Sequence, residues 1–240
     1  MSNYNLQTPP PFNGYTDEPK LAQATSSVMR QVYVKMTLGM LVTAFISLFC
    51  VSTPSVIHFL VYNRWCFWGL FIAEIAIVFF LSARLTRMSS QAASGLFYLF
   101  AAINGAALSP IFLIYTGASI AKTFFITAGT FGAMSVYGYF TTSDLTKWGT
   151  YLIYALFGLI IVSLVNIFTK SSTLDWIISG AGVLIFIGLT AWDTQTVKRM
   201  AAQAVPSQYG HLATIGALNL YLDFINLFLY LLRFFGSSRD

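Results

Sequence analysis

Three acidic residues interrupt the apolar stretches of this 240-residue sequence. Glu74 lies in FWGLFIAEIAIVFF, Asp193 in GLTAWDTQ and Asp223 in LNLYLDFINLFLYLLR. A carboxylate costs about 2.5–3.5 kcal/mol at the centre of a membrane helix on the insertion scale. Acids in such segments usually face the interior of a helix bundle and mark a path for ions or protons. These three positions are therefore the first candidates for chemistry, with Glu74 as an ion-path candidate.

The last apolar stretch carries its polar residues at helical spacing. Asn219, Asp223, Asn226 and Tyr230 follow one another at i, i+4, i+7 and i+11, so they share one face of a helix. Ca²⁺ takes six to eight oxygen ligands from carboxylates, amide carbonyls and water. Asn219 and Asn226 are therefore ion-path candidates, and Asp193 and Asp223 are possible ligands of a transient Ca²⁺. No resident cofactor is expected.

The two aspartates lie on consecutive helices that a short link makes antiparallel. If their carboxyl groups meet, they share one proton and respond to pH as a pair, without a histidine. Arg84, at the end of an earlier apolar segment, would favour the doubly ionised form if it reached them. A structural role for Asp193 is the alternative, either as a helix cap or in an ion pair with Lys198.

Composition places these residues in a membrane protein. Hydrophobic residues make up 57% of the chain and charged residues only 9%, whereas soluble domains carry about 25% charged residues. Uncharged runs of about 20 residues suffice to cross a bilayer core as helices, and the alternating pattern of a β-barrel is missing. The net charge of +5 comes from scattered Lys and Arg at the ends of these runs, which excludes a nucleic-acid-binding tract. The expected partners are the lipid bilayer, Ca²⁺ and protons.

The apolar runs predict an all-α polytopic domain over residues 28–236 with seven transmembrane helices. It is preceded by a polar, proline-containing tail, residues 1–27, which is expected to be disordered, and followed by a short polar tail, residues 237–240. The segment from Pro54 to Arg64 is expected to be a loop. The predicted spans are Val34–Ser52, Trp65–Ala83, Gln91–Tyr115, Ala118–Phe140, Gly149–Phe168, Trp176–Val197 and His211–Leu232.

The distribution of basic residues predicts the orientation. With seven spans, eight Lys and Arg fall on the side of the N-terminus and five on the other side. Because basic residues are retained in the cytoplasm, the N-terminus is expected inside and the C-terminus outside.

Three motifs resemble the Bax inhibitor-1 family: LSARLTRMS (Leu81–Ser89), GLTAWDTQ (Gly188–Gln195) and LNLYLDFINLFLYLLRFFG (Leu218–Gly236). The likeness is to its bacterial inner-membrane branch, the YccA/YbhL-like proteins, and it extends from about Arg30 to Gly236. It implies a multi-pass protein of the bacterial inner (plasma) membrane. The implied fold has seven helices, with two layers of three around a central C-terminal helix.

The resemblance also implies a function. The family is associated with a pH-dependent calcium leak controlled by an aspartate pair, which carries over to Asp193 and Asp223. The family's basic residue in the second helix, matched by Arg84, is thought to latch the closed form, and Glu74 falls where members often have an acid. The leading hypothesis is a Ca²⁺-permeable leak channel, not an enzyme, gated by protonation of the pair.

Two alternatives belong to other functional classes. Some bacterial relatives are linked to a membrane-anchored ATP-dependent protease, so the chain could be a non-conducting regulatory partner that uses its N-terminal tail. Paired aspartates on the sixth and seventh helices also occur in intramembrane aspartyl proteases. Here they sit in WDTQ and LDFI, without the Gly-x-Gly-Asp and Pro-Ala-Leu motifs of those enzymes, which disfavours that alternative.

Overall fold

A computed structural model describes residues 18–84 and 87–237 of the chain. These residues form helices joined by short links, with no β-strand among them. The helices are α1 (Glu18–Ser52), α2 (Pro54–Tyr62), α3 (Arg64–Arg84), α4 (Ser90–Leu108), α5 (Ile111–Ile114), α6 (Gly117–Phe140), α7 (Thr146–Thr169), α8 (Ser172–Gln203) and α9 (Tyr209–Phe235).

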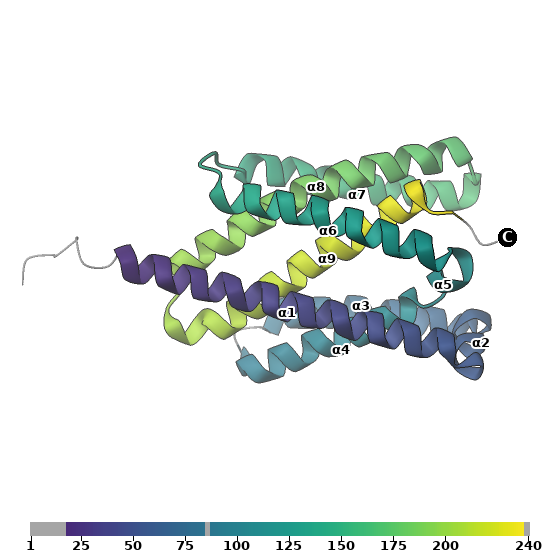
Figure 1. Cartoon of the computed structure of the whole chain (residues 1–240), viewed down its shortest axis with the longest axis horizontal. Helices are drawn as coiled ribbons and strands as arrows, with labels where there is room; N and C mark the ends of the chain where they lie inside the picture. The colour runs from purple at the N-terminus through teal and green to yellow at the C-terminus, as the bar shows by residue number, and fades with distance from the viewer. Residues whose placement is uncertain (1–17, 85–86, 238–240) are drawn as a thin grey trace, which may run out of the picture.

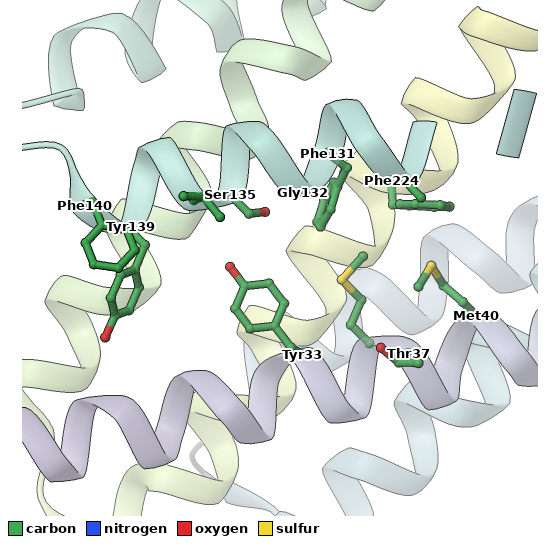
Figure 2. A pocket seen from close by; sticks show the side chains of 12 residues that line it. Tyr33, Thr37, Met40, Phe131, Gly132, Ser135, Tyr139, Phe140 and Phe224 are labelled. Atoms are coloured by element: carbon green, nitrogen blue, oxygen red, sulfur yellow. The ribbon is translucent and has the colours of Figure 1, made fainter. Parts of the chain in front are cut away.

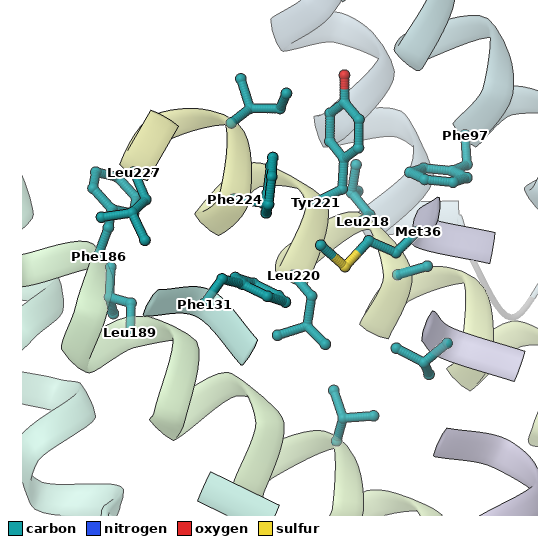
Figure 3. Close-up of a cluster of buried hydrophobic side chains, with 14 of the residues drawn as sticks. Met36, Phe97, Phe131, Phe186, Leu189, Leu218, Leu220, Tyr221, Phe224 and Leu227 are labelled. Carbon is teal, nitrogen blue, oxygen red and sulfur yellow. The ribbon is translucent and has the colours of Figure 1, made fainter. Parts of the chain in front are cut away.

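Helix α9 runs through the middle of the bundle. Helices α6, α7 and α8 lie along one side of it, and α1, α3 and α4 lie along the other (Figure 1). It packs directly against α1, α4, α6 and α8, and more than half of its residues are buried. Its side chains form the centre of the hydrophobic core, where Phe224 meets Phe131 of α6 edge to face at 5.5 Å (Figure 3). A polar residue on α9 therefore lies inside the bundle.

The outer surface of the bundle is strongly apolar. Large side chains such as Phe79 of α3 and Phe168 of α7 are 75% and 86% exposed. Six helical segments within the described residues are long and apolar enough to cross a membrane: Leu21–Ser52, Arg64–Arg84, Ser90–Ile114, Thr146–Thr169, Ser172–Gln203 and Pro206–Phe235. A surface of this kind suits lipid rather than water. The predicted class, an all-α membrane protein, is confirmed.

Helix α6 coincides with the fourth predicted span but is less apolar than the six. It has 24 residues, long enough to cross a bilayer core, and its Gly, Ser and Thr residues lower its hydropathy. Several of these small polar residues are buried, among them Ser119, Thr123 and Thr127. The polar character of α6 is therefore directed into the bundle.

Two segments that were predicted to be non-helical contain helix. The tail was expected to run to residue 27, but α1 already begins at Glu18, and Thr25 in that stretch is 6% exposed and donates to the backbone oxygen of Leu21. The rest of that tail and residues 238–240 lie outside the described residues. The expected loop from Pro54 is largely the helix α2, which proline at a first-turn position favours because its missing N–H has no helical partner there.

Candidate functional site

The carboxyl groups of Asp193 and Asp223 lie close enough to interact electrostatically. Asp193 lies on α8 and Asp223 on α9, two helices that pack along one another. Asp223 is only 4% exposed, and Asp193 is partly buried. Because an ionised carboxylate can only accept hydrogen bonds, a bond between two carboxyl groups requires a proton on one of them. The arrangement would allow the two acids to share one proton.

No other group competes for this pair within the described residues. The Oδ2 atom of Asp223 is buried without a hydrogen-bond donor from elsewhere in the bundle. Neither carboxyl forms an ion pair with the Lys and Arg side chains of residues 18–84 and 87–237. A buried carboxylate without compensation is costly.

The position of Asp193 in its helix decides between its two predicted roles. Helix α8 continues to Gln203, well beyond the predicted end at Val197, so Asp193 lies inside the helix and does not cap it. Lys198 donates instead to the backbone oxygen of Tyr139 and lies over its ring, at 4.7 Å from the centroid. Asp193 is therefore neither a helix cap nor the ion-pair partner of Lys198.

Glycines bring α6 and α7 against α8 beside the pair. A Cβ atom on Gly138 of α6 would lie 2.2 Å from the backbone oxygen of Ala191, two residues before Asp193. A Cβ on Gly149 of α7 would lie 2.2 Å from the ring of Trp192. Such close approach through small residues is the usual packing device of membrane helices. The position of Asp193 is therefore fixed by backbone contact.

The link between α6 and α7 is attached to the same helix. The Gln195 side chain is 5% exposed; its Oε1 accepts from the backbone N–H of Leu145 at 2.9 Å, and its Nε2 donates to the backbone oxygen of Ser143 at 2.8 Å. Arg199 donates to Asp144 at 2.8 Å. Gln195 was not among the predicted site residues, although an amide two residues after Asp193 in GLTAWDTQ was a signal.

A family model described as "Inhibitor of apoptosis-promoting Bax1" matches residues 25–240, which is most of the chain. The chain belongs to the Bax inhibitor-1 family. Inner membrane protein YbhL of Escherichia coli K12 is 48% identical over 214 residues, covering 88% of this chain and 92% of YbhL. An uncharacterized protein of Borreliella burgdorferi is 43% identical over 227 residues, 94% of this chain and 98% of that protein. An uncharacterized membrane protein of Streptococcus pyogenes serotype M3 is 37% identical over 211 residues, 87% and 91% of the two chains.

In this Bax inhibitor-1 family member, Arg84 stands apart from the aspartate pair. It is the last residue of α3, it is exposed, and its guanidinium carbon lies 5.9 Å from the centroid of the Phe80 ring of the same helix. It forms no ion pair with Asp193 or Asp223 among the described residues. Its role as a latch stays a prediction.

Glu74 belongs to a second polar cluster of the bundle. Its Oε1 accepts from Asn104 Nδ2 at 2.8 Å, and Asn104 Oδ1 accepts from the Tyr221 hydroxyl at 2.9 Å. The Tyr221 oxygen also lies 2.6 Å from Thr43 Oγ1. This cluster of Glu74, Asn104, Tyr221 and Thr43 connects α3, α4, α9 and α1. These partners of Glu74 were not predicted from the sequence, and neither was Tyr221, a fully buried tyrosine whose hydroxyl needs a partner.

The predicted polar face of α9 is divided between two neighbours. Tyr230 packs against Phe186 of α8, with ring centroids 5.8 Å apart. Asn226 instead lines, with Glu74, a cavity of about 550 Å³ between α3, α4 and α9, and its Nδ2 donates to the backbone oxygen of Leu222. Asn219 is partly buried, and its side chain forms no hydrogen bond with an acid among the described residues. The carboxamides thus do not gather around Asp223 as a single set of oxygen ligands.

Proposed function

We propose that this protein is a multi-pass ion leak channel of the bacterial inner membrane, permeable to Ca²⁺ and gated by protonation of Asp193 and Asp223. One observation carries the proposal: two carboxyl groups from adjacent helices are in contact inside an apolar bundle. Such a buried pair costs stability, and intramembrane acids of this kind usually mark ion and proton paths.

The shared proton supplies the gating step. While it is present, the pair carries a single negative charge at most and α8 stays against α9. When it leaves, two like charges lie in contact; two unit charges 4 Å apart repel by about 4 kcal/mol at an effective dielectric constant of about 20. The repulsion favours separation of α8 from α9, and the two negative charges attract a divalent cation. Ca²⁺ is here the conducted ion, and Arg84 would oppose opening by pairing with the ionised carboxyls.

The membrane arrangement that we propose has seven spans, with α6 as the additional one. Its 24 residues rise about 36 Å at 1.5 Å per residue, against about 30 Å of hydrocarbon core. The N-terminus is then cytoplasmic and the C-terminus outside, as the distribution of Lys and Arg favours. Two layers of three helices would surround α9. The name of the Escherichia coli relative supports the inner membrane.

Ca²⁺ flux measured against pH tests this function. The purified protein is reconstituted in liposomes with an internal Ca²⁺ indicator, beside the double variant Asp193→Asn/Asp223→Asn. We expect wild-type flux to rise with pH by up to about tenfold per pH unit, as release of one proton requires, and the double variant to lack this rise. Absence of Ca²⁺ flux at every pH would overturn the proposal. A cellular function that survives the double variant but is lost without residues 1–17 would favour the protease-partner alternative.

The α6–α7 link provides a pH-insensitive control. Hydrogen bonds from the Thr146 hydroxyl and backbone N–H, and then from Arg199, lower the pKa of Asp144 below its usual range. A depressed folded-state pKa means that the contribution of Asp144 is present above about pH 4 and is lost only as the pH falls further. We therefore expect Asp144→Asn to leave the pH midpoint of Ca²⁺ flux unchanged. A midpoint displaced in parallel with the aspartate-pair variants would contradict this assignment.

A further inference from the structure

Helices α1 and α6 border an open seam. Helix α1 packs against α4, α8 and α9, and α6 against α8 and α9, whereas α1 and α6 make no extensive contact with each other among the described residues. A cavity of about 410 Å³ lies between them, with Phe131 and Phe224 in its wall (Figure 2). We call this space the α1–α6 seam. Tyr33 rises into it from α1, and Ser135 points into it from α6.

Two further cavities continue the seam in both directions. A cavity of about 670 Å³ at the ends of α6 and α8 shares Tyr139 and Phe140 with the central one. A smaller cavity of about 120 Å³ toward α5 shares Met40 and Phe224 with it. Because neighbouring cavities share wall residues, the three cavities lie in a row along α6, and we treat this row as one groove.

The groove is cationic at one end and apolar along the rest. Lys198 and Arg199 line the wide cavity at the end of α8. Arg199 is paired with Asp144, whereas Lys198 has no acidic partner in the described part of the chain and only donates to the Tyr139 backbone. The central cavity is walled mainly by aromatic, Met and Val side chains, with a few hydroxyls.

The groove is also open sideways to the bilayer. Val136 and Phe140, on its α6 edge, are 59% and 72% exposed. These residues belong to the apolar outer surface that faces lipid tails. An acyl chain can therefore enter from the side, without passing through water.

We propose that the α1–α6 seam binds one anionic phospholipid. Its phosphate pairs with Lys198 at the end of α8, where basic residues meet lipid headgroups. One of its acyl chains lies along the groove between α1 and α6, over Phe131 and Phe224. Charge complementarity at Lys198 selects an anionic lipid over a zwitterionic one. This site is separate from the Asp193–Asp223 pair and does not depend on the proposed channel activity.

Counting bound lipids by native mass spectrometry tests the site. The full-length protein, in mild detergent, is titrated with phosphatidylglycerol or with phosphatidylcholine of identical chains. Gly132→Leu fills the groove, because a Cβ on Gly132 meets no atom within 4 Å and the side chain can occupy the open space. Gly158→Leu on α7 is the matched control: it is equally unhindered and lies outside the groove. Lys198→Gln removes the charge alone.

We expect one phosphatidylglycerol to bind to the wild type about fivefold more tightly than phosphatidylcholine, the effect of one basic residue near lipid phosphates. Gly132→Leu should lose this bound lipid, Gly158→Leu should retain it, and Lys198→Gln should bind both lipids equally. If Gly132→Leu does not fold, the loss of the preference for phosphatidylglycerol over phosphatidylcholine in Lys198→Gln tests the proposal by itself. Equal lipid binding in the two leucine variants, or no preference in the wild type, would overturn the proposal. So would a wild-type dimer that Gly132→Leu converts to a monomer, because a second copy would then fill the groove.

Discussion

Ca²⁺ flux through Asp223→Asn should be independent of pH between about 5 and 8, where the wild-type flux changes steeply. An asparagine at this position can donate its amide N–H to Asp193, so the contact between α8 and α9 no longer needs a proton. The effect should be large because Asp223 is 4% exposed and has no other hydrogen-bond donor for Oδ2 among the described residues. The measurement is initial Ca²⁺ flux into liposomes as a function of pH.

A second acid-to-amide replacement in the same bundle serves as the control. Glu74→Gln keeps the size of the side chain, and its Oε1 can still accept from Asn104. Because Glu74 is outside the aspartate pair, we expect this variant to change the size of the flux and not the pH at which it rises. An Asp223→Asn protein with the wild-type pH profile would rule out the pair as the gate.

Gly138→Val should prevent stable folding of the bundle. A Cβ at this position would lie 2.2 Å from the backbone oxygen of Ala191 and 2.9 Å from its Cα, and backbone atoms cannot move aside as a side-chain tip can. Overpacking of well-packed sites typically costs about 1–3 kcal/mol, and a backbone clash belongs at or above the upper end. The yield of monodisperse protein and its thermal unfolding in detergent measure the effect.

Gly129→Val on the same helix is the matched control. A Cβ at Gly129 meets no atom within 4 Å, so valine there introduces the same branched side chain without a clash. We expect Gly129→Val to unfold within a few degrees of the wild type. Similar unfolding temperatures for the two variants would show that α6 and α8 are not in close backbone contact at Gly138.

Helix positions were predictable where length and hydropathy alone determine them. The span predicted at Trp65–Ala83 is α3, Arg64–Arg84, because an apolar run of this length with a single charged residue has few alternatives. The start of α1 was not predictable in the same way. Its first turns are polar overall, and the burial of Thr25 and Val28 within the bundle depends on helices distant in sequence.

The candidate site was predictable only in part. The sequence indicates that Asp193 and Asp223 are on adjacent helices, but their relative depth depends on how the link before α9 is folded. Residues at i and i+3 point about 60° apart on a helix. Asp223 therefore faces α8 while Asn226 faces Glu74, and only the positions of the neighbouring helices reveal this difference. The contact between Tyr221 and Asn104 joins residues 117 positions apart, which no local pattern encodes.

The cluster of Glu74, Asn104, Tyr221 and Thr43 has a mechanical consequence. It fastens α9 to α1, α3 and α4 through several hydrogen bonds at once. On the opposite side, α6 and α7 pack against α8 through glycine contacts and through the hydrogen bonds between Gln195 and the α6–α7 link. We therefore expect α9 to move together with α1, α3 and α4 when the bundle rearranges. The bundle would then divide into two rigid halves that hinge apart along the contact between α8 and α9.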